Sequence, residues 1–325
     1  MAERGLLDLM IARLDELTFR EKITLGGMFS GEQDLLQCSV TDIEAIIGRK
    51  LAEFRGMDAV RLLAEGDAAA ALRKGISWVC WPDSAYPPLL REIYDPPVLL
   101  FYRGILPNPE RPLAAIVGTR KPSPRAAAQA FDIGRGLARN GISVVSGLAL
   151  GIDAMAHRGN IEGGAPTVAV MGSGLDGVYP PSNRNLARRL LETGGALLSE
   201  YPPGITPRKW NFPARNRIIS GLARGVLIVE APQKSGALIT ARWALEHNRE
   251  LWVASSGVSS SGSGQKTAID RRGTTKLAED GAGIIHGASD ILEAWNMETS
   301  PGPETGDFPC ILTGSSGHEI YYEKV

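Results

Sequence analysis

Between residues 113 and 286 the chain repeats one pattern, in which a short apolar run is followed by a glycine-rich loop and then by a stretch with helical periodicity. The apolar runs predict strands at 113–118, 142–146, 166–171, 196–200, 225–230, 250–255 and 283–286. Helical stretches separate most of these strands, and strands that are joined through helices run parallel. The pattern therefore predicts an α/β domain with a doubly wound, mostly parallel sheet.

The segment before this repeat has a different pattern. Residues 5–74 show helical periodicity, which predicts a small helical domain over 1–74. The first apolar positions on its helical face are Leu6, Leu7, Met10, Leu14 and Leu17. This domain is either a DNA-binding helical module or a packing or oligomerisation domain. Residues 75–112 hold short apolar and aromatic strands between proline-rich turns, so we expect them to form an edge of the large domain.

Two segments lack periodicity. Residues 255–265 are rich in serine and glycine and predict a flexible loop. Residues 296–325 carry proline, glycine and serine and predict a tail that need not fold. The predicted organisation is thus a helical domain over 1–74, a large domain over 75–295 and a flexible tail over 296–325.

The composition is that of an ordinary soluble globular protein, with 43% apolar and 22% charged residues among 325. The net charge is −1, so a nucleic-acid site would have to be a local cluster of cations. Three cysteines and four histidines lie far apart, which predicts no disulfide framework and no structural metal. The charged N-terminus does not resemble a signal peptide, and no apolar run could span a bilayer. We therefore expect a cytoplasmic protein that does not enter a membrane.

The first glycine loop lies at the edge where parallel strands end and backbone N–H groups bind anions. Gly118 allows close approach of a ligand, Thr119 offers a hydroxyl, and Arg120 can bind a phosphate with two nitrogens. No acidic residue occurs in 112–130, whereas Lys121 adds positive charge. This one-sided charge indicates anion binding. The alternative is an ordinary turn with a solvated arginine.

The second glycine loop runs from Ser146 to Asp153 and precedes a predicted helix. Asp153 and His157 are four residues apart, so they share a helical face, and a nearby serine invites a hydrolase interpretation. The chain has no GxSxG nucleophile elbow here, and an aspartate near a helix start is explained as a cap. We predict no catalytic residue in this loop.

The third loop, GSGLDG at 172–177, matches the GxGxxG fingerprint of dinucleotide-binding enzymes. Glu200 follows at about the distance of a ribose-binding acid. In that fingerprint the helix has begun by the third glycine, whereas here Pro180 and Pro181 exclude a helix until about residue 182. A nucleotide-binding Rossmann enzyme, either a hydrolase or an oxidoreductase, is therefore the alternative function.

The segment 201–229 contains cations and aromatic residues but no acidic residue. Its cations are Arg208, Lys209, Arg215, Arg217 and Arg224, and Trp210 and Phe212 lie among them. Cations neutralise phosphates and rings stack on unpaired bases, so this mixture favours single-stranded nucleic acid. The alternative is that the two rings cap the core and the arginines are solvated.

The ordered motifs VGTR, SGLALGIDAMAH, VMGSGLDGVYPPSN, LLSEYPPG, FPARNRIISGL and EAPQKSGALITARWALEHNR closely resemble those of the DNA processing protein DprA family, also called Smf. The resemblance covers roughly residues 75 to 290. It implies an extended Rossmann-type domain that binds single-stranded DNA, dimerises, and hands incoming DNA to the recombinase RecA in natural transformation. The family is not known as an enzyme family, so the resemblance implies no catalytic residue, metal or cofactor.

By motif, the resemblance assigns the principal DNA contacts to Arg120, Lys209 and Phe212. The surrounding pocket would comprise Ser146, Gly147, Gly174, Asn216, Arg217, Ser235 and Gly236, together with Gly118 and Thr119 of the first loop. This assignment agrees with the chemistry of the residues, because two cations suit phosphates, one ring suits a base, and small residues allow close approach of a backbone.

Some segments depart from the family pattern. The Tyr-Gly pair that usually follows the first basic loop is Arg125-Ala126 here. After the strand at 250–255, a Pro-Gly turn and an asparagine motif are replaced by SSGVSSSGSGQKTAIDRRG and TTKLAEDGA, so the far rim of the pocket should differ. We also expect no counterpart of the relatives' winged-helix module in 297–325.

The sequence thus predicts a cytoplasmic single-stranded DNA-binding protein that protects incoming DNA and loads RecA, and that acts as a homodimer. The alternative from another class is the nucleotide-binding enzyme. A third possibility is a structural interaction protein that binds neither DNA nor nucleotides.

Overall fold

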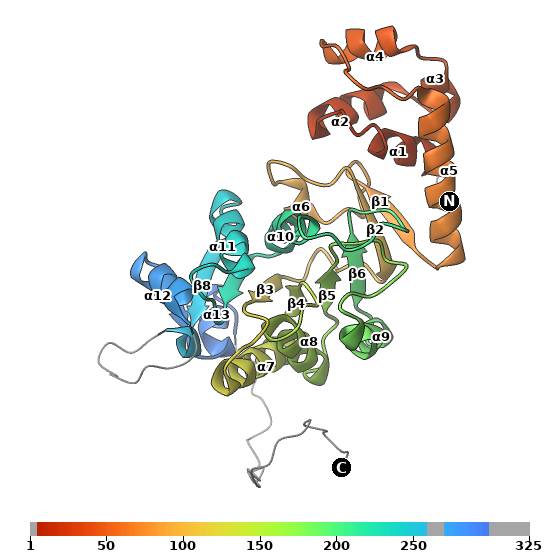
Figure 1. Ribbon diagram of the computed structural model, residues 1–325. Helices are drawn as coiled ribbons and strands as arrows, with labels where there is room; N and C mark the ends of the chain where they lie inside the picture. Colours follow the sequence, from red (N-terminus) through yellow and green to blue (C-terminus); the bar gives the residue numbers. More distant parts are fainter. Residues whose placement is uncertain (1–4, 259–269, 299–325) are drawn as a thin grey trace.

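The computed structural model describes residues 5–258 and 270–298 (Figure 1). The strands are β1 Ser77–Cys80, β2 Leu99–Gly104, β3 Leu113–Val117, β4 Ser143–Ser146, β5 Val168–Val170, β6 Ala196–Ser199, β7 Gly225–Ile228, β8 Glu250–Ala254 and β9 Gly283–Ile285. They form one sheet of nine strands in the order β1-β2-β6-β5-β4-β3-β7-β8-β9. Every strand predicted between residues 113 and 286 is present, and all neighbouring pairs among these strands are parallel. The predicted fold class is therefore confirmed.

The first two strands form one edge of this sheet, as the sequence predicted for residues 75–112. β1 pairs antiparallel with β2, and β2 pairs antiparallel with β6. The turn between β1 and β2 is built around Tyr86, which is 1% exposed and whose hydroxyl donates a hydrogen bond to Pro97 O at 2.8 Å. Tyr86 therefore contributes to packing, whereas Tyr94 of the same turn is 87% exposed.

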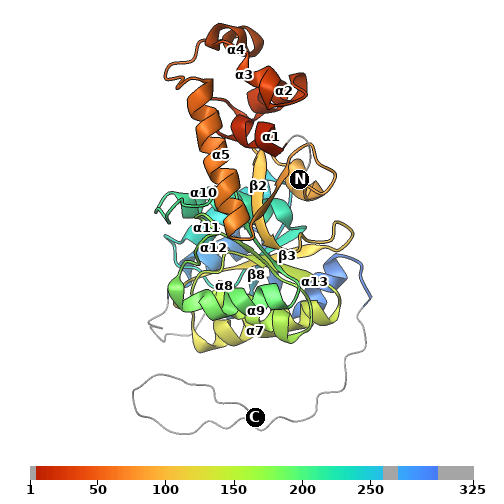
Figure 2. The same ribbon diagram turned by 90° about the vertical axis from the view of Figure 1, so that its right-hand side faces the viewer.

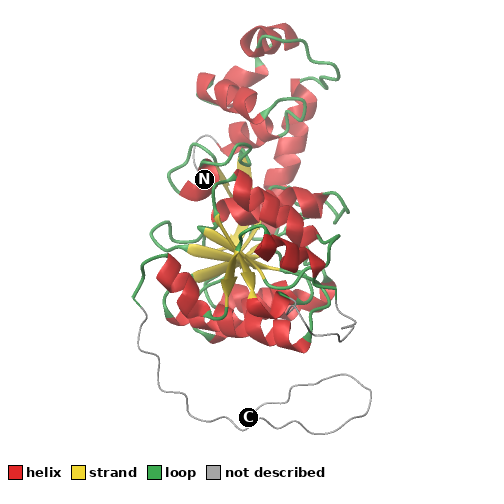
Figure 3. Ribbon diagram, turned by 90° about the vertical axis from the view of Figure 1, so that its left-hand side faces the viewer, coloured by secondary structure: helices red, strands yellow, loops and turns green. Residues whose placement is uncertain are grey.

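Helices cover both faces of the sheet. The α-helices of the described residues are α1 Gly5–Ala12, α2 Phe19–Met28, α3 Glu32–Leu36, α4 Val40–Ile47, α5 Met57–Arg73, α6 Pro88–Arg91, α7 Pro124–Arg139, α8 Ile152–Glu162, α9 Arg184–Glu192, α10 Asn211–Leu222, α11 Gly236–Glu246, α12 Arg272–Glu279 and α13 Ala288–Ala294. Figure 3 shows the strands as a central layer between helices. Across the described ranges, no helix has both the length and the apolar character that a membrane crossing requires.

The alternation of side chains along the strands explains the two helical layers. In β3, Ala114 and Ile116 pack in the same apolar cluster as residues of α7, α8 and α13. Ala115 and Val117, which point to the opposite face, pack in a cluster with residues of α10 and α11. A strand buried on both faces reads as a continuous apolar run, and such runs were the signal that located these strands.

The helices α1 to α5 lie together at one end of the molecule, beside β1 and β2 (Figures 1 and 2). The first helix ends at Ala12. Leu14 and Leu17 are buried, but they lie in the turn after this helix and not on its face, where the sequence had predicted them. Thr18 then caps α2 with a capping box to Glu21. The apolar cluster of these helices continues into β2 at Leu99 and Phe101. That residues 1–74 form a domain of their own stays a prediction.

The first residues of the segment 255–265, which the sequence predicted to be a flexible loop, are held by hydrogen bonds. Ser255–Gly257 forms a 3-10 helix, in which Ser256 N donates to Gln129 Oε1 at 2.9 Å. Thr274 Oγ1 donates to the carbonyl of Gly257 at 2.5 Å. These contacts hold the start of the segment against α7 and α12. The rest of the predicted loop, 259–265, and most of the predicted tail, 299–325, lie outside the described residues.

The order of the strands creates a topological switch point. From β3 the chain proceeds through β4, β5 and β6 toward one edge, whereas β7, β8 and β9 extend toward the other. The loops that follow β3 and β7 therefore leave the sheet in different directions. In open α/β sheets, ligands bind in the crevice that forms at such a point, beyond the carboxyl ends of the strands.

His157 of α8 is a core residue rather than part of a reactive pair with Asp153. Its ring has no exposed surface, and Nδ1 lies 2.8 Å from Thr167 Oγ1. The Thr167 hydroxyl donates its one proton to Val144 O at 2.7 Å, so it can only accept from His157. Nδ1 of His157 is therefore protonated and donates to Thr167 Oγ1. Burial, with a smaller effect of the Arg215 charge, lowers the pKa of His157 to about 3. The imidazole is therefore neutral in the folded protein at neutral pH.

Acidification should weaken folding through His157. The pKa is 6.5 in the ordinary state and about 3 in the folded state, so the unfolded chain binds more protons between these values. The contribution of the neutral His157 side chain to the free energy of unfolding is complete above pH 6.5, and it is lost as the pH falls toward 3. Between pH 7 and pH 5 the free energy of unfolding should drop by about 2 kcal/mol from this group. Urea unfolding at both pH values should show that His157→Gln loses about 2 kcal/mol less than the wild type, and equal losses would contradict this assignment.

Candidate nucleic-acid interface

A cavity of about 660 Å³ opens at the topological switch point, and we call it the switch-point pocket. Its lining residues are Val117, Gly118, Thr119, Arg120, Lys121, Ala149, Asp153, Tyr179, Lys209, Phe212, Pro213, Arg215, Asn216, Ile219, Pro232, Lys234, Ser235, Gly236, Ala237 and Thr240. They come mainly from the loop after β3, the start of α10, and the loop between β7 and α11. The pocket therefore combines the first basic loop with the aromatic and basic segment that the sequence singled out.

The structure brings most of the predicted site residues together in this pocket. Those that line it are Gly118, Thr119, Arg120, Lys209, Phe212, Asn216, Ser235 and Gly236. Gly147 lies directly behind it, where a side chain would collide with the guanidinium of Arg215. The DNA-contact role of these residues stays a prediction.

Three predicted residues lie outside the switch-point pocket. Ser146 is fully buried, and its hydroxyl donates to Ile116 O at 2.6 Å. Gly174 is also buried, and its N–H donates to Ile205 O at 2.8 Å. Arg217 points to the other side of α10, where it forms ion pairs. The position in the family motifs identified these residues, but it does not report the direction in which a residue faces.

The first glycine loop is held by its neighbours so that Arg120 projects into solvent. A Cβ atom on Gly118 would lie 2.7 Å from Ile152 Cγ1 and 3.0 Å from Glu230 O, so only glycine fits. Thr119 N donates to Glu230 O at 2.8 Å, and Thr119 O accepts from Ile152 N at 3.2 Å. With its backbone fixed on both sides, the loop presents the exposed side chain of Arg120 at the pocket mouth.

An aromatic pair forms one wall of the pocket. The ring centroids of Phe212 and Tyr179 are 5.5 Å apart with an interplanar angle of 37°. Arg120 Cζ lies 5.7 Å from the centroid of the Phe212 ring. Asn211 fixes this wall, because its Nδ2 donates to Gly172 O at 3.0 Å. Sequence reasoning missed Tyr179, although an aromatic residue directly after the glycine loop of β5 was a usable signal.

The floor of the pocket contains two buried groups of opposite charge, Arg215 and Asp153, which make no direct ion pair. Arg215 is 5% exposed and donates through Nη1 to Gly147 O at 2.9 Å and to Val170 O. Burial lowers the pKa of Arg215 to about 10, and the charge of Asp153 opposes this change. Burial also raises the pKa of Asp153, with the Arg215 charge acting in the opposite direction. These two charges therefore stabilise each other beneath the site and are not free to bind a ligand.

Two carboxylates of the protein accept hydrogen bonds from the loops that lead into α7 and α8. Asp153, in the first turn of α8, accepts from Gly147 N at 3.1 Å and Ala149 N at 3.3 Å, two donors of the loop that precedes the helix. The N-cap residue of α8 is Gly151, which has no side-chain cap, so the prediction that Asp153 caps this helix is wrong, and its carboxylate binds the loop instead. At the start of α7, Glu230 accepts from Ser123 N at 2.7 Å and from Ser123 Oγ at 3.0 Å. These loop donors are therefore not available to a phosphate.

The starts of α10 and α11 have the opposite character. Neither helix has an acidic residue in its first turn. Lys209 precedes α10 and Lys234 precedes α11, and both side chains are exposed. The exposed cations of the pocket are Arg120, Lys121, Lys209 and Lys234. Within the described ranges none of these four forms an ion pair, and the one carboxylate among the lining residues is buried. The rim of the pocket is therefore positive.

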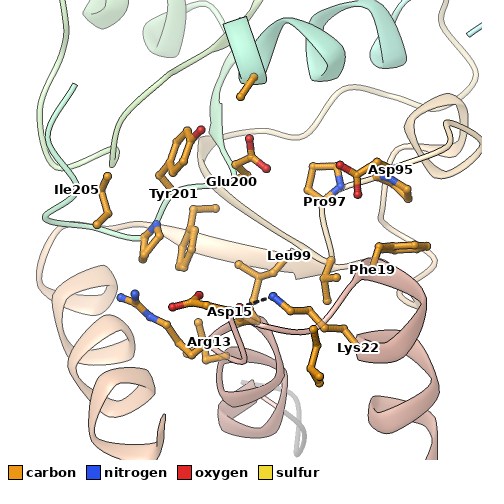
Figure 4. Close-up of a pocket in the computed structure, with 18 of the residues that line it drawn as sticks. Arg13, Asp15, Phe19, Lys22, Asp95, Pro97, Leu99, Glu200, Tyr201 and Ile205 are labelled. Atoms are coloured by element: carbon orange, nitrogen blue, oxygen red, sulfur yellow. Dashed lines mark hydrogen bonds between the residues drawn. The ribbon is translucent and has the colours of Figure 1, made fainter. Parts of the chain in front are cut away.

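A second cavity, of about 640 Å³, separates the N-terminal helices from the sheet (Figure 4). Its charges are largely paired with each other. Arg217 binds Glu200 with two hydrogen bonds of 3.1 and 2.7 Å, and Asp95 at 3.3 Å. Across the cavity, Lys22 Nζ donates to a backbone carbonyl at 2.8 Å. Such a mixed and internally satisfied lining offers less to a polyanion than the switch-point pocket does.

The dinucleotide fingerprint is not assembled. After GSGLDG the chain forms a 3-10 turn at Pro181–Asn183, and α9 begins only at Arg184, as the two prolines predicted. Glu200, the candidate ribose-binding acid, is engaged by Arg217 at the second cavity. The glycine loop therefore lacks both the helix N-terminus and the free carboxylate that a dinucleotide requires.

Comparison with known proteins agrees with this geometry. The family model described as DNA recombination-mediator protein A matches residues 77–296. Protein Smf of Synechocystis is 41% identical over 236 residues, which span 71% of this chain and 56% of that protein. The DNA processing protein DprA of Streptococcus pneumoniae is 41% identical over 210 residues, which span 65% of this chain and 71% of that protein. The chain thus covers only just over half of the Synechocystis relative.

Two solved structures extend this result. The DNA processing protein A of Streptococcus pneumoniae aligns with a TM-score of 0.68 and 34% identity, covering 88% of this chain and 97% of that chain. The DNA processing protein A of Helicobacter pylori, solved to explain its single-stranded DNA binding mode, aligns with a TM-score of 0.57 and 28% identity, covering 68% and 95%. The chain belongs to the DNA recombination-mediator protein A family, which includes the DprA and Smf proteins.

Proposed function

We propose that this member of the DNA recombination-mediator protein A family binds single-stranded DNA in the switch-point pocket. The observation that carries the proposal is the juxtaposition of Arg120 and Lys209 with the ring of Phe212, in a pocket whose carboxylate is buried. The relative from Helicobacter pylori was solved for its single-stranded DNA binding, which supports the same ligand here.

Phosphates would be bound at the rim rather than in the loops. Glu230 and Asp153 already accept from Ser123 N, Gly147 N and Ala149 N, so these backbone donors of the loops are not available. The exposed cations and the acid-free starts of α10 and α11 surround the open side of the pocket. A phosphate backbone that follows this rim would meet positive charge from several elements, which suits a polymer better than a single small anion.

Bases would be bound by the exposed parts of the aromatic residues. Phe212 is half-buried and Tyr179 is 41% exposed, so their rings support each other while part of their surface stays accessible. Trp210 is 66% exposed and lies two residues before Phe212, with Arg208 Cζ at 5.5 Å from its ring centroid. Rings at this depth can stack on a base that has left its neighbours, but not on a base inside a duplex.

We further propose that binding, not catalysis, is the activity of the site. Asp153 is buried with Arg215, and Glu230 is fully buried and hydrogen-bonded to Ser123. Within the described ranges, no accessible carboxylate or histidine that could form an acid–base pair lines the pocket. The nucleotide-enzyme alternative would require such a pair or a bound cofactor.

In the cell, the proposed role is to protect incoming single strands and to load them onto RecA during natural transformation. The family description as a recombination mediator supports this role, and the resemblance implies a cytoplasmic homodimer. A site that holds the strand by its backbone and by few bases has little sequence preference, as a mediator of recombination requires.

An oligonucleotide titration tests the proposed ligand. Single strands should bind well above duplex of the same length, because only unpaired bases reach the rings. The affinity should fall with salt, with a log–log slope of about −0.7 for each phosphate neutralised. Fluorescence anisotropy at several salt concentrations measures both quantities, with nucleotides as competitors. Equal affinity for duplex, or efficient competition by mononucleotides, would falsify the proposal.

Removal of a rim cation should weaken binding without unfolding the protein. Arg120→Ala and Lys209→Ala each remove an exposed side chain, so we expect lower single-strand affinity and a salt slope that is shallower by about 0.7. Arg224→Ala is the matched control, because Arg224 is an exposed cation of the same acid-free segment that packs over Trp295, away from the pocket. If both rim variants bind like the control, these loops do not hold DNA.

Phe212→Ala should reduce single-strand affinity while leaving the salt slope nearly unchanged, because no phosphate contact is lost. A stacked base is worth about 1–3 kcal/mol. Phe212→Tyr, which retains the ring, should bind almost normally. The competing interpretation makes Phe212 a core residue, whose truncation typically costs about 3–5 kcal/mol of stability. A large fall in the melting temperature of the DNA-free variant would favour that interpretation, and near-normal melting with weak binding would favour stacking.

A further inference from the structure

Glu230 is a fully buried carboxylate directly after β7, beneath the loop that carries the first rim cations. Its backbone carbonyl accepts from Thr119 N at 2.8 Å, and its side chain accepts from Ser123 N and Oγ. The two ends of the 119–123 loop are therefore both attached to this residue. Arg120 and Lys121 lie between the two attachment points.

The charge of Glu230 is balanced by Arg271. Arg271 Nε donates to Glu230 Oε1 at 2.7 Å, and the arginine side chain is 17% exposed. Arg271 does not line the switch-point pocket, so it is not placed to contact a ligand there. Its position is unusual in sequence, because it lies in the segment that departs from the family motif before α12.

The segment around Arg271 is itself fastened to the loop after β7. Gly273 N and Thr274 N donate to Ala231 O at 3.1 and 3.3 Å. A Cβ atom on Gly273 would lie 2.6 Å from Pro232 O, so the two backbones are in close contact. The start of α12 therefore supports both Glu230 and the loop that leads to Lys234, on opposite sides of the pocket.

We infer that Arg271 is a positioning residue for DNA binding, which acts by balancing the Glu230 carboxylate under the 119–123 loop. The inference rests on the proposed function of the pocket. Without Arg271, a buried negative charge would face the phosphates that Arg120 and Lys121 attract, and its burial would cost stability unless the loop moved to admit water. Both consequences lower the affinity for a polyanion although no DNA contact is removed.

The test compares Arg271→Ala with a matched control, Arg272→Ala. Arg272 is the next residue, it carries the same charge, and its exposed side chain pairs with Asp270 at 2.9 Å. Arg271→Ala should weaken single-strand binding by about three- to tenfold, which is the effect expected when the one negative charge of Glu230 near the strand is no longer balanced. The salt slope should stay unchanged, because no phosphate contact is lost. Arg271→Lys should bind nearly like the wild type. Arg272→Ala should show no comparable loss.

The double variant Glu230→Gln with Arg271→Ala separates charge balance from other roles. Because it removes the carboxylate together with its partner, it should recover most of the lost affinity and of the melting temperature. It also serves as the reference if Arg271→Ala alone does not fold. Wild-type affinity in Arg271→Ala would overturn the inference. A shallower salt slope without recovery in the double variant would also overturn it, because it would show a direct phosphate contact.

Arg120→Ala measured in the same series distinguishes the failure of this inference from the failure of the proposed function. If Arg120→Ala weakens binding and Arg271→Ala does not, only the positioning role is wrong. If neither variant changes single-strand affinity, the pocket does not bind DNA and both proposals fall.

Discussion

The site depends on how this protein satisfies the backbone donors that gather where parallel strands end. Such an edge collects N–H groups and helix N-termini, which attract negative charge. Here two of the protein's own carboxylates, Asp153 and Glu230, accept from backbone donors of the loops that precede α8 and α7. These contacts fix the loops, and each carboxylate has an arginine to balance it. In the proposed function, a further anion would therefore bind farther out, at the side-chain cations on the rim and at the starts of α10 and α11.

This arrangement explains which parts of the molecule could be predicted from the sequence. The strands were predictable because a strand buried on both faces must be apolar throughout, and Leu113–Val117 is buried at every position. The late start of α9 was predictable because Pro180 and Pro181 forbid an earlier helix. In both cases a local rule decides the outcome, so no knowledge of distant residues was needed.

The direction and pairing of charged side chains were not predictable in this way. The acid-free segment 201–229 contains cations with three different roles: Lys209 is exposed, Arg215 is buried under the pocket, and Arg217 pairs with Glu200 and Asp95. The absence of acids within a segment does not prevent pairing with acids that the fold brings from elsewhere. For the same reason the role of Arg271 could not be predicted from the sequence, because its partner Glu230 lies 41 residues earlier in the chain.

The strength that such a rim can provide also bears on the proposed role. If each of its four exposed cations neutralised one phosphate, the log–log salt slope would be about −2.8, or about a fiftyfold loss of affinity between 50 and 200 mM salt. Stacking on the exposed rings adds an interaction of about 1–3 kcal/mol per base that salt does not remove. The rings would thus retain a strand while the phosphate contacts exchange. A site that combines exchangeable phosphate contacts with base stacking can hold DNA without sequence preference. It can still release the strand to another protein that competes for the same phosphate backbone.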